Sequence, residues 1–181
     1  MQAAPEVVAS QLEWVHIPST HAYQLLVGNQ HFGTLTWQKG SGSIAAAESS
    51  EGRWTLKRRG FLWPGITVRS IATRRDLAVL RAQWRESTIQ TADGRVFRWA
   101  REGFKDPVWK VTDVEGKEML SFEPRRRGKH LEGCVVVASR DAGSDPALLL
   151  LLILGWYFIV IAWVEEHHDV TGAIGATLGE A

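Results

Sequence analysis

The sequence predicts a mainly β protein, in which a closed antiparallel β-barrel of roughly 12 strands encloses a hydrophobic C-terminal α-helix. Two observations predict this fold class. Short segments with alternating apolar residues recur between residues 11 and 139, at about one per eleven residues, which is the spacing typical of an all-β sandwich or barrel. An uncharged apolar run over residues 147–164 then follows, and a helix that is apolar on every side must be buried.

Eleven or twelve segments are predicted to be strands. The clearest covers residues 53–58, where Trp54 and Leu56 alternate with polar neighbours, so that one face of the sheet is buried and the other is wet. Residues 73–81 fit a strand or a helix equally well. The expected strands cover residues 11–17, 23–27, 31–38, 44–48, 53–58, 66–69, 77–80, 84–90, 95–99, 108–112, 117–122 and 130–139.

The apolar run at residues 147–164 reads ALLLLLILGWYFIVIAWV. Residues 140–145 before it are predicted to form a loop. Ser144 or Asp145 is a suitable N-cap, and Pro146 suits the first helical position. As a helix the run spans roughly 27 Å, close to a bilayer core of about 30 Å, and no Lys or Arg follows Arg140. The rival environment is a barrel interior, because barrels of more than about eight strands leave space that their own side chains do not fill.

Composition and charge set limits on function. The chain has 181 residues, a net charge of +1 and a single cysteine, Cys134. The balanced charge gives no reason to expect a nucleic-acid partner, and one cysteine allows no internal disulfide. No secretory signal is evident at the N-terminus. We expect an N-terminal segment over residues 1–19, a barrel domain over 20–165 with its helix at about 146–164, and a flexible tail over 166–181.

The order of about twelve strands and then an apolar helix resembles the tubby C-terminal superfamily, which includes tubby proteins, phospholipid scramblases and LURP-one-related proteins. The resemblance covers residues 20–165, and it is carried by the segments GRWTLKRRG at 52–60, DGRVFRW at 93–99 and the apolar run from residue 148 to 164. It implies that the strands close around the last helix, which therefore lies inside the barrel and not in a bilayer.

The same resemblance implies a function. We expect a non-enzymatic module that binds anionic phospholipid headgroups, or a protein partner at a membrane surface. The expected location is the cytoplasm, with peripheral attachment to the membrane. One alternative is a tail-anchored membrane protein with a cytoplasmic β domain. Another is a scramblase-like lipid transporter. The acidic segment expected before a scramblase's helix is here only Asp141 and Asp145, and the cysteine-rich segment is missing, which disfavours the last alternative.

Basic side chains are the candidate ligands for an anionic headgroup, because several cations near an anionic surface contribute about 1 kcal/mol each. In a strand, Lys57 and Arg59 share one face and Arg58 takes the other. A second group lies in a predicted loop. The candidate anion-binding residues are Lys57, Arg59, Arg125, Arg126, Arg127 and Lys129. The alternative is a set of solvated charges that protect strand edges.

Other chemistry finds little support in the sequence. Glu165 and His168 would share a helix face, but adjacent ligand types alone are a weak metal signal, and we expect no metal or cofactor. Cys134 lies in the apolar segment HLEGCVVV, which predicts a buried, inert thiol. No nucleophile, metalloprotease or phosphate-loop motif is present, so the sequence predicts no enzyme and no catalytic residue.

Overall fold

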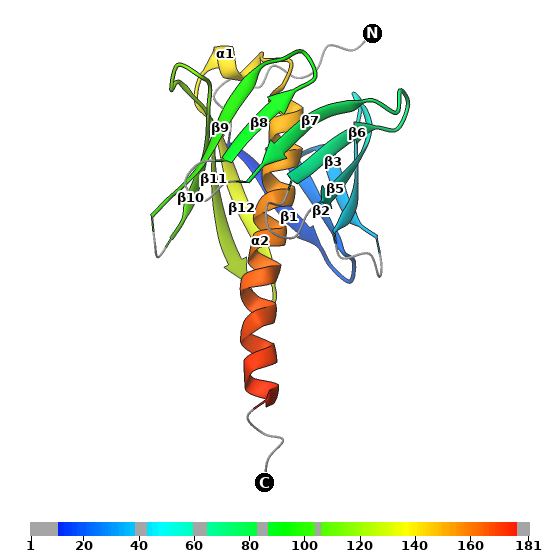
Figure 1. Ribbon diagram of the computed structural model, residues 1–181, viewed down its shortest axis with the longest axis vertical. Coiled ribbons are helices and arrows are strands. Elements are labelled where there is room, and N and C mark those ends of the chain that lie inside the picture. Colours follow the sequence, from blue (N-terminus) through cyan, green and yellow to red (C-terminus); the bar gives the residue numbers. More distant parts are fainter. Residues whose placement is uncertain (1–10, 39–42, 60–64, 83–86, 104–105, 177–181) are drawn as a thin grey trace.

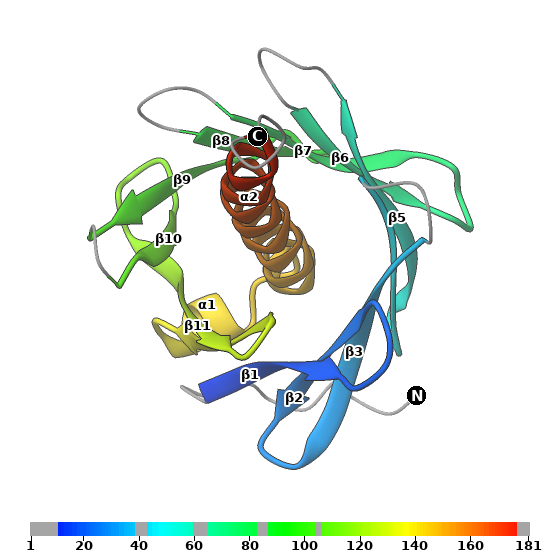
Figure 2. The same cartoon turned by 90° about the horizontal axis from the view of Figure 1, so that it is seen from below.

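The fold class predicted from the sequence is confirmed. A computed structural model describes residues 11–38, 43–59, 65–82, 87–103 and 106–176, with side chains described through residue 166. In this part of the chain, twelve strands close into an antiparallel barrel and an apolar helix runs through its centre. Figure 2 looks along the barrel and shows this helix inside the ring of strands.

The elements follow one another along the chain with short connections (Figure 1). Eleven of the twelve expected strands lie wholly in the described residues, and the first three residues of the segment expected at 84–90 lie outside them. The elements are β1 (Gln11–Ile17), β2 (Ala22–Val27), β3 (Gln30–Trp37), β4 (Ile44–Ser49), β5 (Gly52–Arg59), β6 (Gly65–Ser70), β7 (Asp76–Arg81), β8 (Ser87–Thr91), β9 (Val96–Glu102), β10 (Val108–Thr112), β11 (Glu118–Arg127), β12 (His130–Val137), α1 (Arg140–Gly143) and α2 (Leu148–Ala176).

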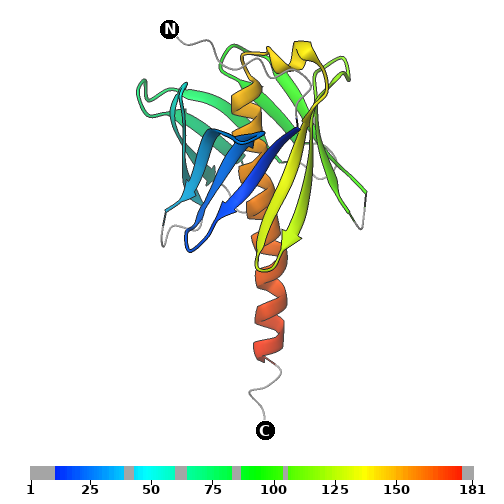
Figure 3. The same ribbon diagram turned by 180° about the vertical axis from the view of Figure 1, so that it is seen from behind.

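Each strand pairs with its neighbour in sequence, and the pairing of β1 with β12 closes the ring. The barrel therefore includes β1 and starts before residue 20, where the sequence placed the boundary of the domain. We call the end at which α1 and the beginning of α2 lie the start end, and the end at which α2 leaves the barrel the exit end. The hairpins β1–β2 and β11–β12 turn at the exit end (Figure 3).

Three local predictions differ from the structure. The run at 140–145 was expected as a loop, but Ser139 caps a four-residue helix there by accepting a hydrogen bond from Ala142 N. β11 continues to Arg127, although the basic run at its end was expected in a loop. The α2 helix begins at Leu148 and continues past residue 164 to Ala176, so that its last part extends beyond the strands (Figure 1).

The barrel interior is filled by the helix. The inward residues of the strands, such as Leu56 and Phe122, are fully buried, and so are Leu151, Leu154 and Trp156 on α2. By length and hydropathy the segment Leu148–Glu166 could cross a membrane, but 67% of that window is buried inside the structure. The described strands thus provide the apolar environment that the helix requires, as the enclosed-helix interpretation predicted.

The wall approaches the helix closely at Gly155. A Cβ atom at this position would lie 2.6 Å from Phe122 Cζ and 2.8 Å from Trp99 Cζ3. Both atoms belong to buried aromatic rings, which have little freedom to move away. The glycine therefore allows two rings of the wall to lie directly against the helix backbone.

Gly155→Ala should destabilise the protein, even though alanine is the better helix former by about 1 kcal/mol. Because the added methyl group overlaps two buried rings, we expect a loss of roughly 1–3 kcal/mol in the free energy of unfolding, measured by urea denaturation. Gly65→Ala is the control, since its Cβ atom would meet only Leu80 O at 3.6 Å. A gain in stability for Gly155→Ala would show that α2 does not pack against these rings.

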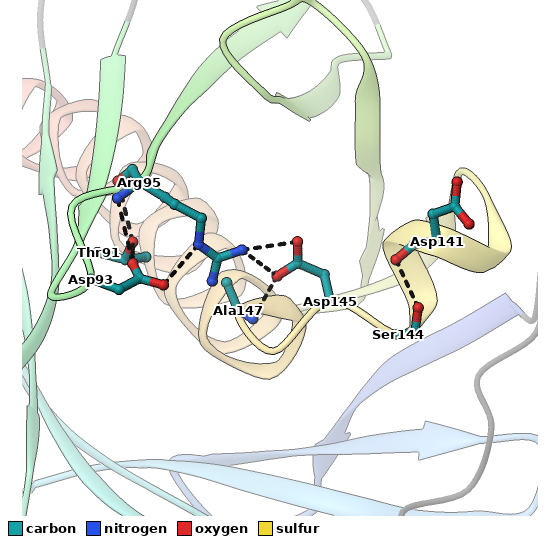
Figure 4. A network of polar contacts seen from close by, with 7 residues as sticks. All are labelled: Thr91, Asp93, Arg95, Asp141, Ser144, Asp145 and Ala147. Carbon is teal, nitrogen blue, oxygen red and sulfur yellow. Dashed lines mark hydrogen bonds and ion pairs between the residues drawn. The ribbon is translucent and has the colours of Figure 1, made fainter.

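Asp145 fixes the start of α2 (Figure 4). Its Oδ1 accepts a hydrogen bond of 2.7 Å from Ala147 N, as a capping residue does. Its two carboxylate oxygens also accept bonds of 2.8 and 3.0 Å from Nη1 of Arg95, which precedes β9. Arg95 Nε in turn contacts Asp93 at 2.8 Å. One carboxylate therefore caps the helix and ties it to the β8–β9 hairpin, in agreement with the predicted cap.

Asp145→Ala should lower the free energy of unfolding by roughly 2 kcal/mol, because it removes both the cap and the charged hydrogen bonds. Asp145→Asn keeps an acceptor for Ala147 N and should lose about half as much. Asp141→Asn serves as the control, since the Asp141 carboxylate is 83% exposed where it contacts Lys117 and such pairs contribute little. Equal losses for the Asp141 and Asp145 variants in urea denaturation would contradict this role of Asp145.

Candidate functional site

A cavity opens at the exit end between α2 and the barrel wall. Its volume is about 610 Å³. Side chains from five strands, from the adjoining loops and from α2 meet there, although they are far apart in the sequence. The cavity is lined by His16, His21, Tyr23, Trp37, Gln38, Ser43, Arg58, His130, Val160, Ile161, Trp163, Val164 and Glu165.

Arg58 reaches this cavity because of the alternation of β5. Trp54 and Leu56 are buried in the core, so Arg58 is the next inward residue, whereas Lys57 and Arg59 are exposed on the outer face. The prediction that the basic triplet is divided between two faces is thus confirmed. The Arg58 side chain is 22% exposed and forms an ion pair with Glu165 of α2.

Aromatic rings form the deeper wall of the cavity. Trp37 stacks on Tyr157 with ring centroids 5.6 Å apart, and Tyr23 meets Trp37 edge to face at 5.7 Å. The Tyr157 hydroxyl donates a hydrogen bond to the carbonyl oxygen of Ser43. Burial raises the pKa of Tyr157 well above its usual value. These rings therefore present a rigid apolar surface that remains uncharged in the physiological range.

Histidines form the adjoining part of the wall, where the His16 ring meets Tyr23 edge to face at 5.3 Å. The rings of His16 and His130 stack with centroids 3.6 Å apart, and His16 Nε2 is 2.9 Å from the carbonyl oxygen of Thr20. Desolvation, and then the charge of His16, lower the pKa of His130. The charges of His21 and Lys129 lower it further, while that of Glu132 raises it. A neutral His130 ring thus suits the folded structure better than a charged one.

Acidification should weaken the fold through His130. Because its pKa is lowered, the unfolded chain takes up this proton at a higher pH than the folded chain does. The contribution of His130 to stability is therefore present above the usual histidine pKa of about 6.5 and is lost as the pH falls below it. We expect the melting temperature of the wild type to fall more steeply than that of His130→Gln between about pH 7.5 and about pH 5.5.

His31→Gln is the matched control for that measurement. His31 is exposed on β3 at the start end, away from the histidine stack. This variant should keep the pH dependence of the wild type. Identical slopes in the wild type and in His130→Gln would show that the stacked pair does not resist protonation.

A second cavity of about 400 Å³ lies on another side of α2 at the exit end. Arg101 of β9 lies over the Trp109 ring at 5.5 Å and contacts Glu166 at 3.3 Å. The consecutive residues Glu165 and Glu166 therefore pair with cations of two different strands. These ion pairs tie the helix to the wall just after its uncharged apolar run.

Of the predicted anion-binding residues, Lys57 and Arg59 lie together on the outer face of β5 at the exit end. The strand register adds a third cation that the sequence analysis did not identify. Arg59 is opposite Gly65 of β6, and Gly65 is opposite Arg81 of β7. Arg59, Arg81 and Lys57 are exposed, and they form no ion pair with a carboxylate of the described residues. We call Lys57, Arg59 and Arg81 the outer basic patch.

The second predicted group is arranged differently. Arg125 pairs with Glu123 at 3.2 Å, and Arg127 pairs with Glu132 at 2.8 Å. Arg126 Nε donates a hydrogen bond of 3.0 Å to Gly128 O, while Lys129 is exposed in the β11–β12 hairpin. The expectation of a loop here was wrong, because β11 extends through Arg127. Arg125, Arg126 and Arg127 nevertheless line one surface depression of about 330 Å³, together with Glu132.

The two predicted groups do not combine into one site. β5 and β11 are separated by five strands in either direction around the ring, so they lie on opposite sides of the barrel. On β11 the paired carboxylates offset much of the positive charge. The outer basic patch on β5 and β7 is thus the stronger candidate for an anion.

Two further predictions concern Cys134 and the acidic C-terminal run. Cys134 lies in β12 as expected, but it is only half-buried and its neighbours Gly133 and Val135 take the inward positions. The prediction of a buried core thiol was therefore wrong. In the C-terminal run, Glu165 pairs with Arg58, and the side chains of residues 167–169 lie outside the described part. Among the described side chains no group of three or more potential metal ligands occurs.

Comparison with known proteins yields no relative: no family model matches the chain, and no curated protein or solved structure shows significant similarity to it. The class established by the structure is a closed twelve-stranded antiparallel barrel around a central apolar helix. The resemblance to the tubby C-terminal superfamily stays a prediction that rests on the segments named above.

Proposed function

We propose that this protein is a non-enzymatic binding module that attaches to anionic phospholipid headgroups at a membrane surface through the outer basic patch. The observation that carries the proposal is the register Arg59–Gly65–Arg81 across three adjacent strands. A residue without a side chain separates two exposed arginines, which leaves open space between two guanidinium groups.

The dimensions of this arrangement suit a phosphate group. Adjacent strands lie about 4.8 Å apart, so the Cα atoms of Arg59 and Arg81 are separated by roughly 10 Å. Two long arginine side chains can converge on one phosphate across that distance, and guanidinium groups bind phosphate oxygens in a bidentate manner. Lys57, one outward position further along β5, supplies a third charge on the same face.

The charges of the described residues around it leave the patch positive. The Asp76 carboxylate accepts a hydrogen bond of 2.6 Å from Arg69 Nε, which lowers the pKa of Asp76, and the charge of Arg59 lowers this pKa further. Asp76 is therefore already paired with a cation outside the patch. Each cation held near an anionic membrane contributes about 1 kcal/mol, so three of them support reversible surface attachment. Headgroup binding is also what the tubby resemblance implies.

The alternatives named from the sequence are less well supported. A tail anchor requires a free apolar span, whereas most of Leu148–Glu166 is buried by the strands. A scramblase-like transporter would need free acidic side chains before the helix. Asp141 instead contacts Lys117 at 3.2 Å, and Asp145 is bound to Arg95. We therefore place the proposed function in the barrel wall and not in the helix.

Gly65→Glu tests the proposal without removing any cation. The position has space for a side chain, and the new carboxylate would lie between Arg59 and Arg81. Wild-type protein should sediment with phosphatidylserine-containing vesicles and not with pure phosphatidylcholine vesicles. Gly65→Glu should weaken this binding at least about fivefold, the equivalent of one lost surface charge of about 1 kcal/mol.

Gly65→Ala is the matched control, since it fills the same position without charge and should bind vesicles as the wild type does. Arg125→Gln on the opposite wall should also have little effect, because that arginine is paired with Glu123. Soluble inositol trisphosphate as a competitor distinguishes a headgroup from a bilayer requirement. Equal sedimentation of all variants, or no preference for anionic vesicles, would overturn the proposal.

A further inference from the structure

We infer that the 610 Å³ cavity at the exit end binds a small amphipathic carboxylate, whose apolar body lies between α2 and the aromatic wall and whose carboxylate replaces Glu165 on Arg58. This site is distinct from the outer basic patch. It uses the opposite face of β5, and neither site requires the other.

The size and lining of the cavity argue for a small molecule. Ligand pockets span roughly 300–1,000 Å³ and are mostly apolar with a few polar groups, and this cavity falls within that range. Trp37 and the α2 residues Val160, Ile161 and Val164 supply apolar walls. The polar groups of the lining include Arg58 and the histidines, so a mostly apolar wall carries a few polar groups.

The charge at the cavity argues for a single negative charge on the ligand. Among the lining residues that the structure describes, Arg58 is the only lysine or arginine. His130, whose lowered pKa favours the neutral ring, adds little positive charge. A dianion would therefore leave one of its charges without a matching cation in a partly desolvated place. One guanidinium and one carboxylate form the matched bidentate pair.

Glu165 shows how that carboxylate would be held. It is a carboxylate of the protein's own chain, it lies at the cavity's edge, and it is paired with Arg58. Its side chain is 53% exposed while that of Arg58 is 22% exposed, so Glu165 can return to water at low cost whereas Arg58 requires a partner. A ligand carboxylate can therefore exchange with Glu165 without leaving a charge unpaired.

The test compares decanoate with decan-1-ol, which has the same chain length and no charge, by calorimetric titration of the full chain. Wild-type protein should bind one decanoate at least about tenfold more tightly than decan-1-ol. Glu165→Gln removes the competing carboxylate and should tighten decanoate binding. Arg58→Gln should weaken it about tenfold, to the level of decan-1-ol.

The opposite signs of these two effects are diagnostic. Both variants break the same ion pair, so a purely structural role would make them weaken binding alike and lower the melting temperature alike. Gly65→Glu should bind decanoate as the wild type does, which separates this site from the outer basic patch. Decanoate binding no tighter than that of decan-1-ol, or equal losses in the Arg58 and Glu165 variants, would overturn the inference. If Arg58→Gln does not fold, the gain in Glu165→Gln decides alone.

Discussion

The interior of a twelve-stranded ring must be filled, and this requirement determines the rest of the structure. A barrel of about eight strands is filled by its own side chains, whereas a wider one leaves a central space. Here α2 fills that space along its apolar length, and Gly155 lets Phe122 and Trp99 reach its backbone. The same packing explains why a segment with the length and hydropathy of a membrane span is buried in protein. The cavity opens where this filling ends.

Most of the fold could be predicted because local patterns specify it. Alternation in segments such as 53–58 gave the strands, and the uncharged run at 147–164 gave the helix. The end of β11 could not be recognised, because Pro124 and three arginines resemble a loop and their pairing partner is on another strand. Cys134 was misplaced for a related reason. In a strand with several apolar residues in a row, the sequence does not show which of them point inward. The structure shows that Gly133 faces α2, so that its neighbour Cys134 does not.

The candidate sites depended more on tertiary structure. Alternation alone separated Arg58 from Lys57 and Arg59, and the structure agrees. The sequence around Arg81 does not indicate that this residue is aligned with Arg59, with Gly65 between them. Such an alignment depends on the register of paired strands, which becomes known only from the structure. Likewise, Arg58 pairs in the cavity with Glu165, which lies more than a hundred residues further along the chain. Such a site exists only once the ring has closed.

One strand therefore links the two proposed sites. In β5, successive side chains alternate between the inner cavity and the outer wall, so Arg58 faces the cavity whereas Lys57 and Arg59 face outward. The register is in turn fixed by Trp54 and Leu56, which are buried against the interior. A slip of one residue would turn both arginine positions and expose both apolar side chains at once. The burial of the core thus also specifies which cation faces the helix and which faces the surroundings.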